Sequence, residues 1–117
     1  MVKRKSDKTM NDLKLFESQY IRSVWNSNED QWYFSIIDVV GVLTDSVNPS
    51  AYWRKLKQRL KSEGNETVTN CHKFKLSATD GKMRLTDIAN TEELLRIIQS
   101  IPSPKAEPFK ANISNVM

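Results

Sequence analysis

The residues of this sequence best suited to chemistry are cations, five of them within eight positions: Arg54, Lys55, Lys57, Arg59 and Lys61. Cations at this density can neutralise the phosphates of a nucleic acid. At about 100° per residue, a helix places three of them (54, 57 and 61) on one flank and two (55 and 59) on the other. Gln58 lies between the flanks, where it could meet base edges while the cations straddle phosphates.

The same helix has an apolar arc, made of Tyr52, Trp53, Leu56 and Leu60. We expect this arc to face the core, so Tyr52 and Trp53 are interpreted as core residues and not as platforms for base stacking. An alternative reading of the cations stays open, because long cationic side chains often only cover the sides of an apolar stripe and keep a helix soluble.

A second group of cations surrounds the Asp80-Gly81 dipeptide: Lys73, Lys75, Lys82 and Arg84. Asp-Gly between alternating stretches predicts a β-hairpin turn. A hairpin tip with four cations could reach a phosphate next to the helix, which favours nucleic acid over a merely solvated helix.

The net charge of +4 is distributed unevenly along the chain. Residues 1–8 sum to +3, residues 9–49 to −4, residues 50–63 to +4 and residues 64–117 to +1. The basic character is therefore local to one tail and one helix, which is a stronger indication of a nucleic-acid partner than the overall pI.

Catalytic machinery is sparse in this chain. His72 is the single histidine, with no serine or cysteine motif around it, so one chain cannot assemble a catalytic triad or a multi-histidine metal site. Cys71 is the single cysteine, so one chain has no cysteine metal cluster and no internal disulfide. The three glycines are too scattered for a phosphate loop. Asp38 fits a helix cap better than a catalytic carboxylate. We therefore expect no enzyme activity, no metal and no cofactor, and a structural role for Cys71.

The expected elements form a small single α+β domain of antiparallel hairpins packed with about three helices. Residues 1–12 are expected to form a disordered basic arm. A strand over residues 14–26 pairs with residues 31–35, a helix begins after Ser35, and a second helix runs from the Asn48-Pro49 cap to Gly64. These two helices look like a helix-turn-helix pair.

The hairpin of residues 72–87 follows, and then a helix capped by Asn90 or Thr91. Its Leu94, Ile97, Ile98 and Ile101 repeat at the spacing of a buried helical stripe. Two prolines end it, and "KAEPFKANIS" is expected to begin a last short helix. No apolar run is long enough to cross a bilayer, and the basic amino terminus lacks a signal peptide's apolar region, so we expect a soluble, cytoplasmic protein.

Four stretches carry a family resemblance: "IRSVWNSNEDQWYFSIIDVVGVLTDS", "YWRKLKQRLKSEG", "VTNCHKFKLSATDGKMRLTD" and "ANTEELLRIIQSIPSPKAEPFK". Together they resemble the Bro-N domain of phage and prophage antirepressor-like proteins, which is also the amino-terminal domain of baculovirus Bro-type proteins. The resemblance places the domain at residues 13–110. Residues 111–117 depart from the family pattern and are expected to be an atypical tail, as a truncation would leave.

The resemblance implies a DNA-binding α+β module that takes part in phage and mobile-element regulation, without a known cofactor. It supplies no residue-level motif for binding, so the ten candidate residues rest on the charge argument. They are Arg54, Lys55, Lys57, Gln58, Arg59, Lys61, Lys73, Lys75, Lys82 and Arg84. The expected partner is duplex DNA.

The alternative is a protein-interaction module that binds a phage repressor through acidic Glu29 and Asp30 or an exposed apolar surface, with the basic helix merely solvated. Homodimer formation is a further alternative.

Overall fold

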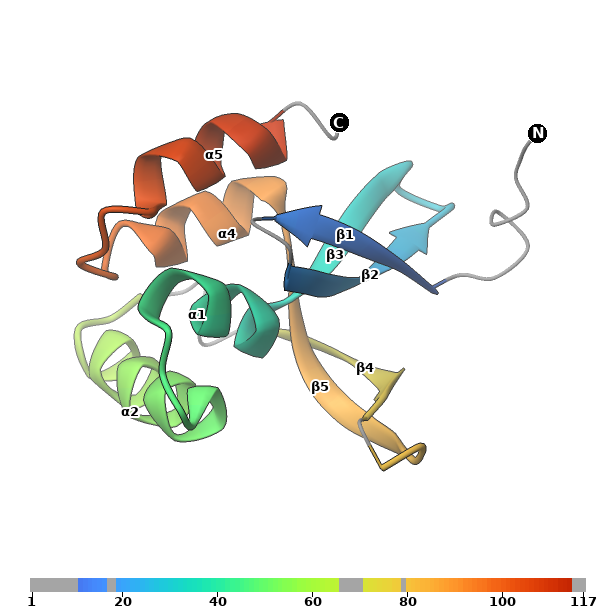
Figure 1. The fold of residues 1–117 in the computed structure, drawn as a ribbon, viewed down its shortest axis with the longest axis horizontal. Helices are drawn as coiled ribbons and strands as arrows, with labels where there is room; N and C mark the ends of the chain where they lie inside the picture. Colours follow the sequence, from blue (N-terminus) through green and yellow to red (C-terminus); the bar gives the residue numbers. More distant parts are fainter. Residues whose placement is uncertain (1–10, 17–18, 66–70, 79, 115–117) are drawn as a thin grey trace.

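A five-stranded antiparallel sheet, with strand order β1-β2-β3-β5-β4, organises the described part of the chain (Figure 1). This computed structural model describes residues 11–16, 19–65, 71–78 and 80–114. The strands are β1 (Asn11–Phe16), β2 (Gln19–Asn26), β3 (Gln31–Ser35), β4 (His72–Ser77) and β5 (Met83–Asn90). The helices are α1 (Ile36–Thr44), α2 (Pro49–Ser62), α4 (Thr91–Ile98) and α5 (Ala106–Ser114). The predicted α+β class is confirmed, and the last short helix expected at "KAEPFKANIS" is present as α5.

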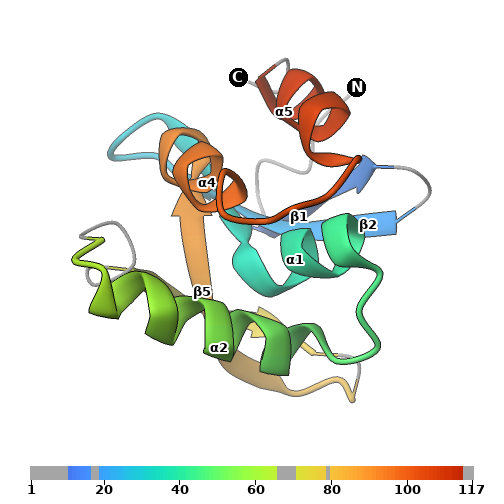
Figure 2. The same ribbon diagram turned by 90° about the vertical axis from the view of Figure 1, so that its left-hand side faces the viewer.

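The helices cover one face of the sheet, and the main core lies between them and the strands (Figures 1 and 2). Strand residues Ile21, Phe34 and Ala89 contribute to this core, and Phe109 of α5 is only 2% exposed in it. The opposite face of the sheet carries a smaller buried cluster, made of Val24, Tyr33, Leu76 and Ile88. The sheet is therefore apolar on both faces, but helices cover only one of them.

Helix ends follow the sequence signals closely. Asn48 Oδ1 accepts a hydrogen bond from the Ala51 N–H at 3.1 Å, and Pro49 occupies the first turn of α2. The same helix ends where Gly64 takes a φ of +81°, a left-handed conformation that costs glycine little. Asn90 and Glu93 cap α4 reciprocally through their side chains. Asn90 is thus the cap of α4, and Thr91 is its first residue.

Two expectations about the amino-terminal half were wrong. The stretch from residue 14 to 26 does not form one strand, because it divides into β1 and β2, which pair antiparallel with each other. The sequence there has no glycine or proline to signal a turn. Moreover, β1 begins at Asn11, inside the range expected for the basic arm. Residues 1–10 of that arm lie outside the described residues.

Asp38 also behaves differently from the expectation. Ser35 caps α1 as predicted, because its Oγ accepts from the Asp38 N–H at 3.3 Å. The Asp38 carboxylate, however, does not return to the cap: it binds Arg22 of β2, with Nε and Nη2 each 2.8 Å from a carboxylate oxygen. A bidentate, charge-assisted contact with a guanidinium is stronger than a hydrogen bond from one backbone N–H. Asp38 therefore joins α1 to the sheet.

Candidate nucleic-acid interface

The outer face of α2 carries the exposed part of the basic helix. Trp53, Leu56 and Leu60 are buried, as the apolar arc predicts, whereas Tyr52 is half-buried. On the opposite arc, four of the candidate residues are exposed and have no ion-pair partner within the described ranges: Arg54, Lys55, Gln58 and Lys61. We call these four residues the outer strip of α2. They can meet an anionic ligand without first breaking an internal contact.

Lys57 is placed differently, because Asp87 of β5 holds it. The Lys57 ammonium lies 2.8 Å from Asp87 Oδ2, and the indole N–H of Trp53 donates to the same oxygen at 2.7 Å. From the hairpin side, the Lys73 ammonium lies 2.5 Å from Asp87 Oδ1. Two of the ten candidate residues are thus engaged by one carboxylate that the sequence reasoning missed.

Asp87 is 8% exposed, and its environment acts on its titration in opposite directions. Burial by itself raises the pKa of this carboxyl, but the hydrogen bonds from Lys57, Lys73 and Trp53 outweigh burial and hold the pKa at about 2. The hydrogen bond to Asp87 also raises the pKa of Lys73. Asp87 is therefore ionised at neutral pH, where it binds the ammonium groups of both lysines.

The remaining cations of α2 and the hairpin differ in how firmly they are paired. Arg59 lies 3.9 Å from Glu63 and donates to the Ser100 carbonyl at 3.3 Å. Arg84 pairs with Asp80 at the hairpin tip, and both side chains are more than two-fifths exposed. Such exposed pairs contribute little and give way to a phosphate. In the described part of the chain, Lys75 and Lys82 are exposed with no ion-pair partner.

The predicted hairpin forms, with a longer connection than the Asp80-Gly81 dipeptide suggested. Strands β4 and β5 leave residues 78–82 as the loop. The Ala78 N–H donates to the Lys82 carbonyl at 2.8 Å, and Gly81 takes a φ of +84°. Asp80 Oδ1 accepts from the Lys82 N–H at 3.0 Å, which helps to keep the pKa of Asp80 below its usual value. These contacts of Ala78, Asp80 and Lys82 fix the tip cation Lys82 at the end of the ribbon.

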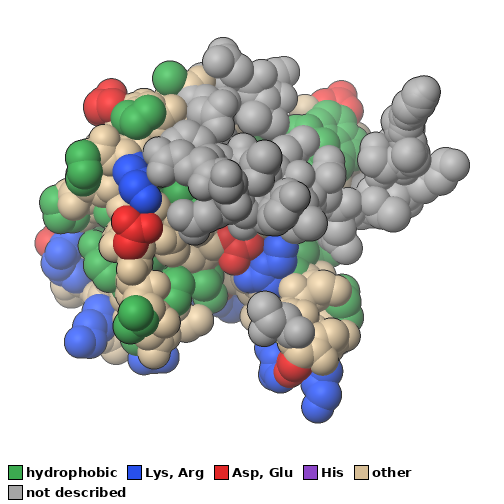
Figure 3. Space-filling view, viewed as in Figure 1, with side chains coloured by type: hydrophobic (Ala, Val, Ile, Leu, Met, Phe, Trp, Pro, Cys, Tyr) green, Lys and Arg blue, Asp and Glu red, His purple; other side chains and the backbone are tan. Residues whose placement is uncertain are grey.

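The two basic groups lie side by side because Asp87 connects them. Figure 2 shows α2 running beneath α1 and across β5, where the contacts of Asp87 with Trp53 and Lys57 join the helix to the strand. In Figure 3, Lys and Arg side chains gather over α2 and again at the tip of the hairpin, with a notch between the two. The structure therefore brings the candidate residues of both elements to one end of the molecule.

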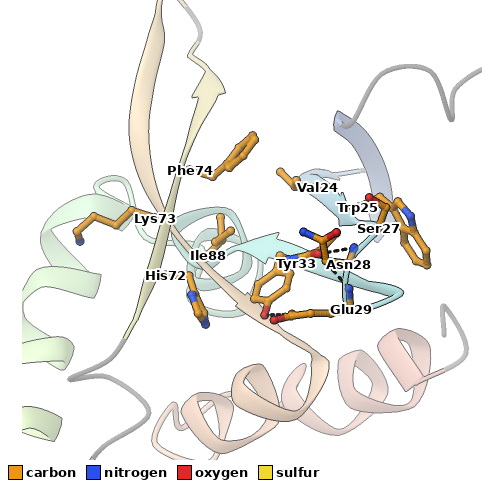
Figure 4. A pocket seen from close by; sticks show the side chains of 11 residues that line it. Val24, Trp25, Ser27, Asn28, Glu29, Tyr33, His72, Lys73, Phe74 and Ile88 are labelled. Atoms are coloured by element: carbon orange, nitrogen blue, oxygen red, sulfur yellow. Dashed lines mark hydrogen bonds between the residues drawn. The ribbon is translucent and has the colours of Figure 1, made fainter.

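The uncovered face of the sheet contains a different feature, an open groove of about 490 Å³ between the β2–β3 and β4–β5 hairpins (Figure 4). Tyr33, His72 and Phe74 line it, and Glu29 lies at its edge, where it accepts a 2.6 Å hydrogen bond from the Tyr33 hydroxyl. The neighbouring Cys71 thiol has its pKa raised to about 11, first by burial and then by the charge of Asp87. This thiol is protonated at neutral pH, as a structural cysteine is.

Metal and membrane features do not add to the picture in the described part of the chain. No group of three or more histidine, cysteine, aspartate or glutamate side chains is placed there to hold a metal ion. None of the helices described is long and apolar enough to span a membrane.

A small α+β domain whose exposed cations gather on one helix and one neighbouring hairpin has the charge distribution typical of nucleic-acid-binding modules. Comparison with known families is consistent with that class. The model of the BRO family, N-terminal domain, matches residues 20–117, and the chain belongs to this family. The match includes residues 111–117, which were expected to be atypical. The Bro-N family is associated with DNA-binding and antirepressor-type proteins. No curated protein and no solved structure matches the chain.

Proposed function

We propose that this Bro-N domain binds duplex DNA through the outer strip of α2 together with the β4–β5 hairpin. The observation that carries the proposal is the adjacency of the two basic groups, with Asp87 as the link between them. The phosphates of a duplex are spread over a wide surface, so a domain that binds it needs cations on more than one element. In this proposal, Gln58, which is exposed in the middle of the outer strip, contacts base edges.

The number of available cations sets the expected salt dependence. Among the described residues, five exposed candidate cations have no ion-pair partner: Arg54, Lys55, Lys61, Lys75 and Lys82. If each neutralises one phosphate, the slope of log K against log salt is about −4.5. A fourfold increase in salt then lowers the affinity about 500-fold.

The biological role that fits this binding is regulation of the phage antirepressor type. An antirepressor can act by occupying an operator or by binding the repressor itself. Membership of the Bro-N family supports this role. The proposal includes no catalytic step.

One observation favours a second candidate, a protein-interaction module that binds a phage repressor. The groove beside the β2–β3 hairpin has apolar walls that include Phe74, which is 41% exposed, and an acidic edge at Glu29. A protein partner seated there would be bound mainly through apolar contacts. Its affinity would therefore depend only weakly on salt, in contrast to DNA bound by α2.

The test compares two double variants that remove the same charge from different places. Arg54→Gln/Lys61→Gln alters the outer strip, whereas Arg96→Gln/Lys110→Gln alters α4 and α5. Titration of a fluorescent generic duplex at several salt concentrations should give the wild-type slope of about −4.5. The outer-strip variant should show a slope of about −2.7 and about 60-fold weaker binding near 0.1 M salt.

The α4–α5 variant should bind as the wild type does. Equal losses in both variants would mean that net charge alone is responsible, and absence of binding by the wild type at low salt would favour the repressor-binding candidate.

A further inference from the structure

The outer half of the β4–β5 hairpin, residues 75–85, exposes an apolar face. Leu85 is 63% exposed and Met83 is 52% exposed, and both belong to the four large hydrophobic residues that are exposed in the described part of the chain. A single exposed apolar residue is ordinary on a protein surface. Two bulky ones at alternate positions of one strand form a continuous apolar edge on the ribbon.

The strand register shows which face this is. Leu85 pairs with Lys75 and Met83 pairs with Ser77, two and four residues from the Asp87–Lys73 pair. Side chains alternate along a strand, so Leu85 and Met83 share the face of Asp87, the face that contacts α2. Strand β5 contacts α2 at Asp87, which accepts hydrogen bonds from Trp53 and Lys57. Further along the ribbon, this face is open.

The opposite face of the same ribbon is fixed to the sheet. Leu76 is 1% exposed and packs in the cluster with Val24, Tyr33 and Ile88. In addition, the Arg22 guanidinium donates through Nη1 to the Ser77 carbonyl at 2.9 Å. The exposure of Met83 and Leu85 is therefore a property of an ordered ribbon that is anchored on one side and uncovered on the other.

Charge decides what kind of partner can cover this face. Residues 75–85 contain three cations, Lys75, Lys82 and Arg84, against one carboxylate, Asp80, which leaves a net charge of +2. Two copies of such a ribbon would repel each other, whereas an anionic partner would be attracted. Duplex DNA combines phosphates with apolar sugar edges and base steps, and proteins that bind its minor groove often place a leucine or methionine between base steps and cations on the phosphates.

We propose that the outer half of the β4–β5 hairpin enters the minor groove of the DNA, with Met83 and Leu85 pressed against a base step. Lys75, Lys82 and Arg84 contact the phosphates on either side. The inserted side chains unstack the step partly and bend the duplex away from the hairpin, so that more of its backbone reaches the outer strip of α2. The exposed fractions of Met83 and Leu85 show that this apolar face is accessible. This inference rests on the proposed DNA binding and adds the groove and the deformation.

The variant that tests the wedge is Met83→Thr/Leu85→Thr, because threonine suits a strand and both positions are exposed. The control is Val47→Thr, a fully exposed apolar residue in the α1–α2 connection. Thermal unfolding should give the same midpoint for all three proteins. The bend is measured by energy transfer between dyes at the two ends of a short duplex with an A·T-rich centre.

The wild type and Val47→Thr should raise the energy transfer, and a small molecule that occupies the minor groove should prevent the rise. Met83→Thr/Leu85→Thr should abolish the rise and lower the affinity about 10-fold. Its salt slope should become shallower than that of the wild type, because less of the backbone then reaches the outer strip of α2. If the double variant binds and bends DNA as the wild type does, the wedge is overturned while the proposed function stands.

If the wild type shows no salt-dependent binding, both proposals fail. The oligomeric state is measured by sedimentation. If the wild type is a dimer and Met83→Thr/Leu85→Thr is a monomer, the apolar face is an interface between two copies of the chain, and its role in DNA binding is overturned.

Discussion

Replacing Asp87 with asparagine should lower stability and raise DNA affinity at the same time. Asparagine resembles the protonated carboxyl: it keeps an oxygen for the Trp53 indole but no charge for Lys57 or Lys73. Folding lowers the pKa of Asp87 from its ordinary value of 3.8 to about 2. That difference corresponds to about 2.5 kcal/mol at neutral pH. Because the Lys73 side chain is 48% exposed and its contact is screened, we expect a loss of about 2 kcal/mol.

The pH dependence of this loss has a definite sign. A carboxyl whose pKa is lowered by folding stabilises the protein fully above its ordinary pKa, and that stabilisation disappears as the pH falls through the folded pKa. The difference between wild type and Asp87→Asn should therefore be complete at pH 7, about half as large at pH 3, and small near pH 2. With an m-value of about 1.5 kcal/mol/M, the urea midpoint should fall by about 1.3 M at pH 7.

Glu92→Gln is the matched control, because it changes the net charge by the same amount at an exposed pair, with the Glu92 carboxylate 3.0 Å from Arg96. Its effect should stay below about 0.5 kcal/mol. The reasoning about Asp87 is refuted if Asp87→Asn costs less than about 0.5 kcal/mol at pH 7, or if its cost is equal at pH 7 and pH 3.

The same variant frees two ammonium groups beside the outer strip of α2. If the proposed DNA binding is correct, the salt slope should steepen from about −4.5 to about −6, and affinity should rise at least 10-fold near 0.1 M salt. Glu92→Gln should change neither. A protein that was only destabilised would lose affinity, so the opposite signs of the two effects separate electrostatics from unfolding.

Three further predictions concern the contacts that hold the fold. Arg22→Ala should cost about 2 kcal/mol in chemical denaturation, because it leaves the half-buried Asp38 carboxylate without its bidentate partner, and Arg22→Lys should recover only part of that loss. Asn90→Ala should lower stability by about 1 kcal/mol, because the reciprocal cap with Glu93 is lost, and the loss is measured as a lower thermal midpoint. The control, Asn28→Ala in the exposed β2–β3 turn, should cost less. Cys71, whose thiol pKa is about 11, should react with a thiol reagent at pH 8 far more slowly in the folded protein than in urea, and equal rates would contradict its burial.

Local signals in the sequence were sufficient for the helix ends and the apolar stripes. Asn48-Pro49 and Gly64 bound α2 as their backbone preferences predict, and the stripe from Leu94 to Ile101 is buried throughout. These features depend on neighbours within about four residues, so spacing alone identifies them. The division of β1 from β2 was missed because it occurs without glycine or proline, the residues that usually signal a turn.

The role of Asp87 could not be derived from spacing, because its partners Trp53 and Lys57 are 34 and 30 residues away. A weaker signal was present. In β5, Met83, Leu85, Asp87 and Ala89 occupy alternate positions, so Asp87 is an acid in an otherwise apolar row. A buried carboxylate requires cationic or hydrogen-bonding partners. The helix α2, with five cations in eight positions, is an element of this chain that can supply them. The cations of α2 are apparent from the sequence, whereas the carboxylate that engages Lys57 comes from a distant strand.

Asp87 therefore links the fold of the domain to its proposed function. By holding Lys57 of α2 and Lys73 of β4 together, it removes two cations from the surface available to DNA. The same contacts fix the distance between α2 and the hairpin. The indole N–H of Trp53 adds a third, neutral hydrogen bond to the Asp87 carboxylate. Backbone phosphates recur at regular intervals along a duplex, so two basic elements that keep a constant separation can contact it together without first being ordered. A freely moving hairpin would lose entropy each time it bound. On this reasoning, the five cations that lack ion-pair partners among the described residues provide the attraction, and the two that Asp87 holds keep those five in position.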